Sequence, residues 1–253
     1  MVEFSSTSAD QTSEPFMLQM SRGLIPGHSY INKFGRNSDV AIGVKEEIWD
    51  GSVAYTYPAT ALMTSMSQTA DQAAMRGQRI EWQGLDANWK MVTQIALLDA
   101  TLTTNVVTLD TPMIRVFRGK VLSSIVGDSP IRCHNAGEST DYAIIGIGNN
   151  QTLMAIYTVP DGHTAHMICY YAHVNPGTNL DPTSNPISLW ARDNERGYAP
   201  QLKHVIGQIS DGFQHFFFPY VSFSERTDIF ITAQPVGKAA DVTAGFDLIL
   251  VEN

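Results

Sequence analysis

The stretch Thr152 to Val174 carries the clearest strand and turn signals of the chain and reads TLMAIYTVPDGHTAHMICYYAHV. Two runs rich in β-branched and aromatic residues, Thr152 to Val159 and His163 to Val174, flank the short segment Pro160-Asp161-Gly162. Proline followed by aspartate and glycine is typical of a tight turn, and the flanking residue types favour strands. We therefore expect these two runs to form the strands of a β-hairpin, which places the chain among β proteins.

Similar runs continue before this stretch. Gln78 to Gln83 alternates, the loop Gly84 to Asn88 follows, and Trp89 to Leu98 returns, which predicts a second hairpin. Thr101 to Leu109 and Met113 to Ser123 predict two separate strands, because the three residues between them, DTP, favour a turn.

Later strands are expected near residues 187–192, 202–209, 213–221, 228–234 and 245–251. Only Ala59 to Arg76 has a composition compatible with a helix, and its Thr and Ser content weakens that interpretation. Regular short strands with turn signals predict an all-β fold made of two β-sandwich or jelly-roll modules.

Three segments are expected along the chain. Residues 1–30 are rich in Ser, Thr, Gln and Met and show no sustained period, so we expect an extended N-terminal arm. The glycine-rich stretch GIGNN, Gly146 to Asn150, separates two groups of strands. We therefore expect an N-terminal β module over residues 31–148 and a jelly-roll-like sandwich over residues 149–253.

Composition argues against several classes of function. The formal net charge is -9 and the 16 Lys+Arg are scattered singly, which disfavours nucleic-acid binding. No window reaches the roughly 18 to 20 apolar residues of a membrane span, and the N-terminus lacks the pattern of a secretory signal. We expect a soluble protein without a membrane partner, made in a cytoplasm. Cys133 and Cys169 are interpreted as reduced thiols that pair only if the fold brings them together.

Metal and cofactor motifs are weak. Gly146-Ile147-Gly148 precedes a predicted strand rather than a helix, so turn glycines are favoured over a nucleotide site. His163, His166 and His173 alternate along one predicted strand, so a single zinc ion cannot easily bind all three. The oxygen-rich residues Asn179, Asp181, Ser184 and Asn185 lack EF-hand spacing, and a plain surface loop is favoured over a Ca²⁺ site.

Catalytic motifs are equally weak. The serines lack a G-x-S-x-G elbow, and neither cysteine lies in a catalytic signature. Asp50 with Glu46 or Glu47 would suit a glycosidase only at a defined separation in space, so solvated acids are favoured. The sequence therefore predicts no catalytic, cofactor-binding or metal-binding residues, and we expect a protein that is not an enzyme.

Aromatic residues in Glu47 to Pro58 (EIWDGSVAYTYP) have two interpretations. Trp49, Tyr55 and Tyr57 share a face if one strand continues through Gly51, and burial in a sheet is favoured over a carbohydrate-binding shelf. The alternative is that Gly51 breaks the strand and turns the aromatic side chains outward.

Aromatic residues in the second half are candidates for recognition. Trp190, Tyr198 and Tyr220 are candidate glycan-binding or interface residues. Phe216, Phe217 and Phe218 in succession predict a strand covered on both faces, lying between modules or in a subunit interface.

Several blocks together carry a resemblance to a known class of protein. They are KFGRN (Lys33 to Asn37), EIWDG (Glu47 to Gly51), the strand start at Tyr55 to Pro58, QGLDANW (Gln83 to Trp89), NQTLMAIYTVPDG (Asn150 to Gly162) and the closing AGFDLILVEN. In this order they resemble virion structural proteins of tailed bacteriophages, especially marine ones, over most of the chain from Lys33 to Asn253.

The resemblance implies a non-enzymatic component of a virus particle. The first expectation is a capsid decoration or cement protein that self-associates, with a trimer as one arrangement, and that binds the capsid lattice through its N-terminal arm. Its partners would be copies of itself and major capsid or tail proteins, and its acidic charge favours the outside of the particle over a surface facing DNA. The alternative is a tail or appendage protein that binds host-surface glycans, and a glycan depolymerase is the least favoured.

Overall fold

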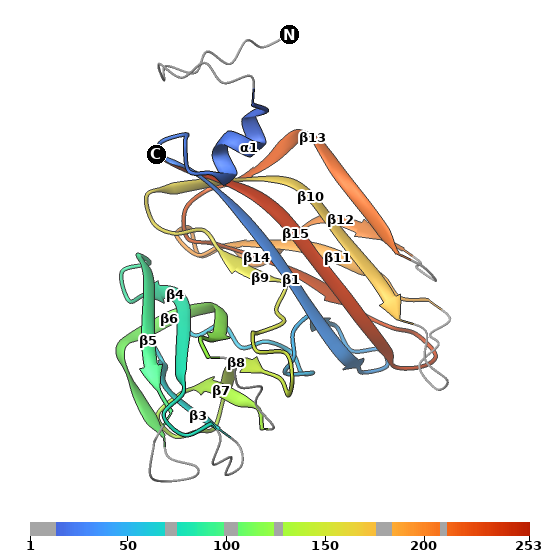
Figure 1. The fold of residues 1–253 in the computed structure, drawn as a ribbon. Helices are drawn as coiled ribbons and strands as arrows, with labels where there is room; N and C mark the ends of the chain where they lie inside the picture. Colours follow the sequence, from blue (N-terminus) through green and yellow to red (C-terminus); the bar gives the residue numbers. More distant parts are fainter. Residues whose placement is uncertain (1–13, 69–74, 99–105, 124–128, 176–183, 208–211) are drawn as a thin grey trace.

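The computed structural model describes residues 14–68, 75–98, 106–123, 129–175, 184–207 and 212–253, and its elements are almost all antiparallel β-strands (Figure 1). A four-stranded sheet has the order β1 (His28–Val40), β15 (Ala240–Glu252), β10 (His163–Asn175) and β13 (Phe213–Phe223). A five-stranded sheet has the order β12 (Gln201–Ile206), β11 (Ile187–Asp193), β14 (Thr227–Ala233) and β2 (Glu46–Glu47), with β9 (Ile156–Thr158) also paired to β14. A six-stranded sheet has the order β5 (Met91–Leu97), β4 (Arg79–Asp86), β6 (Val107–Val121), β3 (Met63–Gln68), β7 (Ile131–His134) and β8 (Asp141–Ile145).

The four- and five-stranded sheets enclose the main hydrophobic core and form a β-sandwich. Alternate residues of β15, such as Val242, Phe246 and Leu248, are fully buried and meet Leu189 of β11 and Ile231 of β14. This alternation follows from the two-residue period of a strand. The all-β sandwich expected from the sequence is confirmed.

The predicted hairpin over Thr152 to Val174 is wrong in its pairing. β9 pairs with β14 in the five-stranded sheet, whereas β10 pairs with β13 and β15 in the four-stranded sheet. The turn Pro160-Asp161-Gly162 therefore carries the chain from one sheet of the sandwich to the other. Asp161 holds this turn through ion pairs with Lys90 and Arg226. Turn residues predict a reversal of the chain, but they do not determine which strands pair.

Two other local predictions are corrected. The segment expected to be helical contains β3, because Met63–Gln68 pairs with β6 and β7 and this tertiary pairing outweighs a weak helical preference. The two strands expected around DTP are one strand, β6. Pro112 lies in an irregular stretch between Thr108 and Met113, where β3 makes no pairs and a missing N–H is tolerated.

The expected segment boundaries do not match the sheets. β1 pairs with β15 and β2 pairs with β14, so residues 28–47 belong to the same sandwich as the C-terminal strands. The six-stranded sheet is inserted between β2 and β9. The expected extended arm over residues 1–30 is wrong for its described part, because α1 (Phe16–Ser21) is a helix beside β1 and β1 begins at His28. Residues 1–13 lie outside the described residues. Within the described part of the chain, no helix is long and apolar enough to span a bilayer.

A buried ion pair joins the six-stranded sheet to the sandwich. Arg115 of β6 donates from Nε to Oδ1 of Asp228 on β14 at 2.8 Å and from Nη2 to Oδ2 at 3.0 Å. Arg192 donates from Nη2 to Oδ2 at 2.7 Å, and the Thr158 hydroxyl donates to Oδ1 at 2.7 Å. Burial alone would raise the pKa of the Asp228 carboxyl, but Arg115 and Arg192 hold that pKa below its usual value.

Removing this carboxylate is expected to cost more stability than removing an exposed one. Asp228→Ala leaves two guanidinium groups without their shared acceptor, one of them buried, and should lower the free energy of unfolding by about 3 to 5 kcal/mol. The exposed i,i+3 pair Asp193–Arg196 supplies the control, because Asp193→Ala should cost less than about 1 kcal/mol. Urea unfolding followed by tryptophan fluorescence measures both values, and equal losses would contradict the structural role of Asp228.

Candidate functional site

The edge strand of the four-stranded sheet carries a bulge. β13 pairs with β10 through Met167↔Val221 and Cys169↔Phe216, so residues 217–220 oppose the single residue Ile168. Within the described residues no strand pairs with the other side of β13. Bulges at a sheet edge interrupt regular pairing and re-aim side chains.

Three aromatic side chains of β13 face solvent. Phe218 is 98% exposed, Phe216 is 62% exposed and Tyr220 is 49% exposed. We call these three residues the β13 surface. The expectation that Phe216 to Phe218 would be covered on both faces is therefore wrong for a single chain, since only Phe217 of the three packs against the core. Neither β13 nor its neighbour β10 contains Asp, Glu, Lys or Arg.

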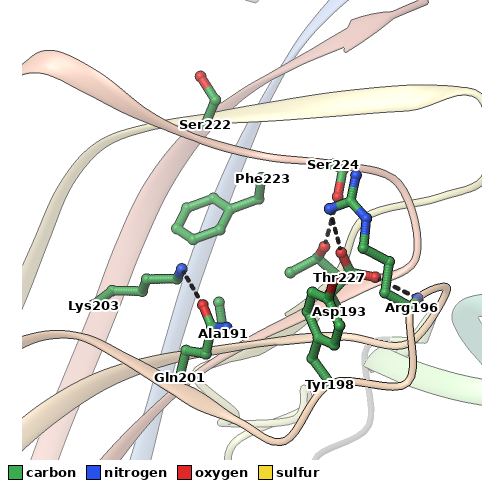
Figure 2. Close-up of a pocket in the computed structure, with 10 residues that line it drawn as sticks. All are labelled: Ala191, Asp193, Arg196, Tyr198, Gln201, Lys203, Ser222, Phe223, Ser224 and Thr227. Atoms are coloured by element: carbon green, nitrogen blue, oxygen red, sulfur yellow. Dashed lines mark hydrogen bonds and ion pairs between the residues drawn. The ribbon is translucent and has the colours of Figure 1, made fainter.

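A small polar pocket lies where the β11–β12 connection meets the β13–β14 turn (Figure 2). Its volume is about 190 Å³, and it is lined by Ala191, Asp193, Arg196, Tyr198, Gln201, Lys203, Ser222, Phe223, Ser224 and Thr227. Arg196 is paired with Asp193 at 3.0 Å, whereas the Lys203 ammonium donates to the neutral amide oxygen of Gln201 at 3.1 Å. The pocket therefore has an excess of positive charge in a chain whose net charge is -9.

The three candidate aromatic residues are not brought together. Tyr198 lines the pocket and Tyr220 belongs to the β13 surface. Trp190 is half-buried and packs toward the six-stranded sheet, where its Nε1 donates to Thr232 Oγ1 at 2.9 Å and Lys45 Nζ lies 4.2 Å from its ring centroid. Trp190 is therefore a packing residue, and no aromatic shelf unites the three positions.

The aromatic residues of EIWDGSVAYTYP form a packed cluster. Ring centroids of Trp49 and Tyr55 lie 5.2 Å apart, and those of Tyr55 and Tyr57 lie 4.7 Å apart. Trp49 and Tyr55 are buried, as the favoured interpretation expected, but no strand continues through Gly51. A Cβ at Gly51 would lie 2.1 Å from the Trp49 ring, so glycine allows the chain to turn closely over the indole.

The acidic residues beside this cluster have structural partners. A Glu47 carboxylate oxygen accepts from the backbone N–H of Tyr55 at 2.8 Å, and Glu46 accepts from Asn37 at 3.0 Å. Burial raises the pKa of the Asp50 carboxyl to about 6. Because Glu46 and Glu47 are both buried and hydrogen-bonded, the interpretation of solvated acids is wrong for these two residues.

Among the residues that the structure describes, no group of three His, Cys, Asp or Glu side chains is placed to hold a metal ion. His163 Nδ1 lies 3.0 Å from the Asp161 carbonyl, and His166 Nδ1 lies 2.9 Å from Ser222 Oγ. Asn179 and Asp181 lie outside the described residues. Cys133 and Cys169 are both buried free thiols, so they do not pair.

A polar network on the outer face of the four-stranded sheet was not foreseen from the sequence. Asp247 Oδ1 accepts from Tyr30 OH and from Asn32 Nδ2, each at 2.7 Å, and Asp247 Oδ2 accepts from Cys169 Sγ at 3.3 Å. Burial and the Asp247 carboxylate raise the pKa of the Tyr30 phenol. Tyr30 was assigned to the arm, and only the pairing of β1 with β15 brings it to Asp247.

No protein-family model matches the chain, and no curated protein and no solved structure shows significant similarity to it.

Truncation of the candidate aromatic residues should separate packing from recognition. Trp190→Ala removes packing against the six-stranded sheet and should lower the free energy of unfolding by about 2 to 3 kcal/mol. Tyr198→Ala, at an exposed position, should change it by less than about 0.5 kcal/mol. Urea unfolding of both variants measures these two changes in the free energy of unfolding. A Trp190→Ala protein as stable as the wild type would show that the indole is dispensable for the fold.

Proposed function

We propose that the chain is a non-enzymatic structural subunit of a tailed-bacteriophage particle, an exterior capsid decoration or cement protein that associates with copies of itself through the β13 surface. The observation that carries this proposal is the exposure of Phe216, Phe218 and Tyr220 on strands that contain no charged residue. Aromatic enrichment and depletion of charge are typical of the centre of a protein–protein interface.

The exposed area favours a partner of protein size. At about 200 Å² for each aromatic side chain, the exposed fractions of the three residues amount to roughly 400 Å². A stable interface buries about 800 Å² on each partner, so three side chains supply roughly half of one face. A second copy of the chain brings the same uncharged surface and adds no charge to be desolvated, although the whole chain has a net charge of -9.

Two further features support the placement on a particle. The blocks from KFGRN to AGFDLILVEN resemble virion structural proteins of tailed phages. The acidic charge disfavours a position against packaged DNA and so favours the exterior.

Loss of the exposed phenyl rings should abolish self-association. The purified protein is expected to form a stable oligomer by light scattering, and the double variant Phe216→Ser with Phe218→Ser should have the 27.8 kDa mass of one chain. Ile147 is 62% exposed in a turn after β8, so Ile147→Ser is the matched control and should remain oligomeric. A monomeric wild type, or a double variant that still forms the oligomer, would overturn the proposed interface.

The pocket beside Tyr198 favours a second candidate, binding of an acidic host-surface saccharide by a tail or appendage protein. Tyr198 offers an exposed aromatic face, the hydroxyls of Ser224 and Thr227 offer hydrogen bonds, and the Lys203 ammonium offers a charge for a carboxylate. Such a combination of one stacking surface with a few convergent polar groups is typical of small-ligand sites.

This second candidate is tested by calorimetric titration with uronic-acid oligosaccharides. Neutral glucose oligomers serve as the comparison. We expect binding of the acidic series alone, and Lys203→Met should weaken it at least tenfold because the carboxylate loses its counter-charge. Lys238→Met removes an exposed charge that does not line the pocket and should bind as the wild type does. Equal heats for the acidic and neutral series, or full binding by Lys203→Met, would rule the site out.

A further inference from the structure

Two histidines join the edges of the sandwich next to the β13 surface. His204 lies on β12, the edge strand of the five-stranded sheet, and His215 lies on β13, the edge strand of the four-stranded sheet. Their rings are stacked with centroids 4.3 Å apart and an interplanar angle of 22°. They therefore form a side-chain contact between two strands that belong to different sheets.

Buried aromatic groups surround this pair. The hydroxyl of Tyr170, a fully buried residue of β10, lies 2.5 Å from His204 Nδ1. The ring centroid of Phe217 lies 4.7 Å from that of His215 and 6.0 Å from that of Tyr170. Phe217 is the inward-facing residue of the bulge, so the same cluster that holds the histidines also holds the backbone between Phe216 and Phe218.

Among the residues that the structure describes, no negative charge pairs with the two imidazoles. On the described elements packed against them, the titratable groups facing the pair are Tyr170 of β10 and each histidine itself, while β11 places Leu189 opposite His204. Lys203 of β12 is exposed and donates to Gln201. Within the described residues no carboxylate forms an ion pair with either ring. A proton added to this stack would therefore have no counter-charge on the described elements, and a second proton would place two cations in contact.

We propose that the stacked pair His204–His215 is a pH-dependent lock on the β13 surface: the neutral rings hold β12 against β13, and protonation separates the two edges and weakens self-association. This inference deepens the proposed function and rests on it.

The direction of the effect follows from the surroundings of His204. Burial, and then the neighbouring His215, lower the pKa of His204 below its ordinary value. The unfolded chain therefore binds a proton more readily than the folded chain. The stability contributed by neutral His204 is present above the unfolded pKa of about 6.5 and is lost as the pH falls below it.

The decisive experiment measures the mass of the full chain by light scattering between pH 8 and pH 5 at constant ionic strength. The wild type should be oligomeric at pH 8, and its dissociation constant should rise at least tenfold as the pH falls below about 6.5. His204→Phe keeps a flat aromatic ring but removes the imidazole whose pKa is lowered by burial, so its dissociation constant should change by less than twofold. His28→Gln, on β1 at the opposite edge of the same sheet, is the matched control and should dissociate as the wild type does.

Each other outcome has a defined meaning. A wild-type oligomer that persists unchanged at pH 5, or a His204→Phe protein that dissociates as the wild type does, overturns the lock and leaves self-association standing. A wild type that is monomeric at pH 8 overturns the proposed function instead. In that case amide hydrogen exchange of the monomer tests whether the histidine pair holds β12 against β13. The protection factors of both strands should fall at least tenfold between pH 7.5 and 5.5 in the wild type.

A measurement on the wild type keeps the inference falsifiable if His204→Phe fails to fold. Nuclear magnetic resonance titration of the His204 ring should give a midpoint below 6.5, and a midpoint above 6.5 would overturn the lock.

Discussion

The buried ion pair between Arg115 and Asp228 joins the six-stranded sheet to the five-stranded sheet of the sandwich. Two charges leave water at the junction, and the cost is offset because Asp228 also accepts from Arg192, from Thr158 and from Asn194 Nδ2 at 2.9 Å. These donors come from β6, β9, β11 and the turn after β11. The carboxylate therefore fixes the six-stranded sheet against the sandwich and anchors the turn that leads to the pocket.

The junction with the six-stranded sheet and the β13 edge differ in which side chains are buried and which are exposed. At the junction with the six-stranded sheet, charged and phenolic groups are buried, and the Arg192 guanidinium lies 4.2 Å from the ring centroid of Tyr57. At the β13 edge, phenyl rings stand in solvent. Buried charges need defined partners and so specify one arrangement of the sheets, whereas exposed phenyl rings leave apolar area for another molecule to cover. This contrast is the physical basis for proposing recognition at the edge, while the buried charges connect the sheets at the junction.

The candidate sites share one structural origin. β12 and β13 are edge strands of different sheets, and each has one side without a partner strand among the described residues. The connection into β12 and the turn after β13 line the pocket, while the bulge of β13 exposes Phe218. His204 and His215 are in contact across these two edges, and the His215 ring also contacts Phe217 of the bulge.

Local properties of this chain follow from its amino-acid sequence alone. Alternation along a segment such as residues 245–251 and turn residues such as Pro160 to Gly162 depend on near neighbours in the chain. Many strand positions, the all-β class and the burial of Trp49 could therefore be predicted, whereas β3 and the continuity of β6 could not. Only the tertiary structure decided the pairing of β9 with β14, the place of β1 beside β15 and the exposure of Phe216 and Phe218. Each of these depends on contacts between residues far apart in the sequence, and backbone hydrogen bonds in a sheet are the same for every partner strand. A strand's own residues therefore specify that it pairs and which face is apolar, while the packing of the whole chain selects its neighbour and the side left open to solvent.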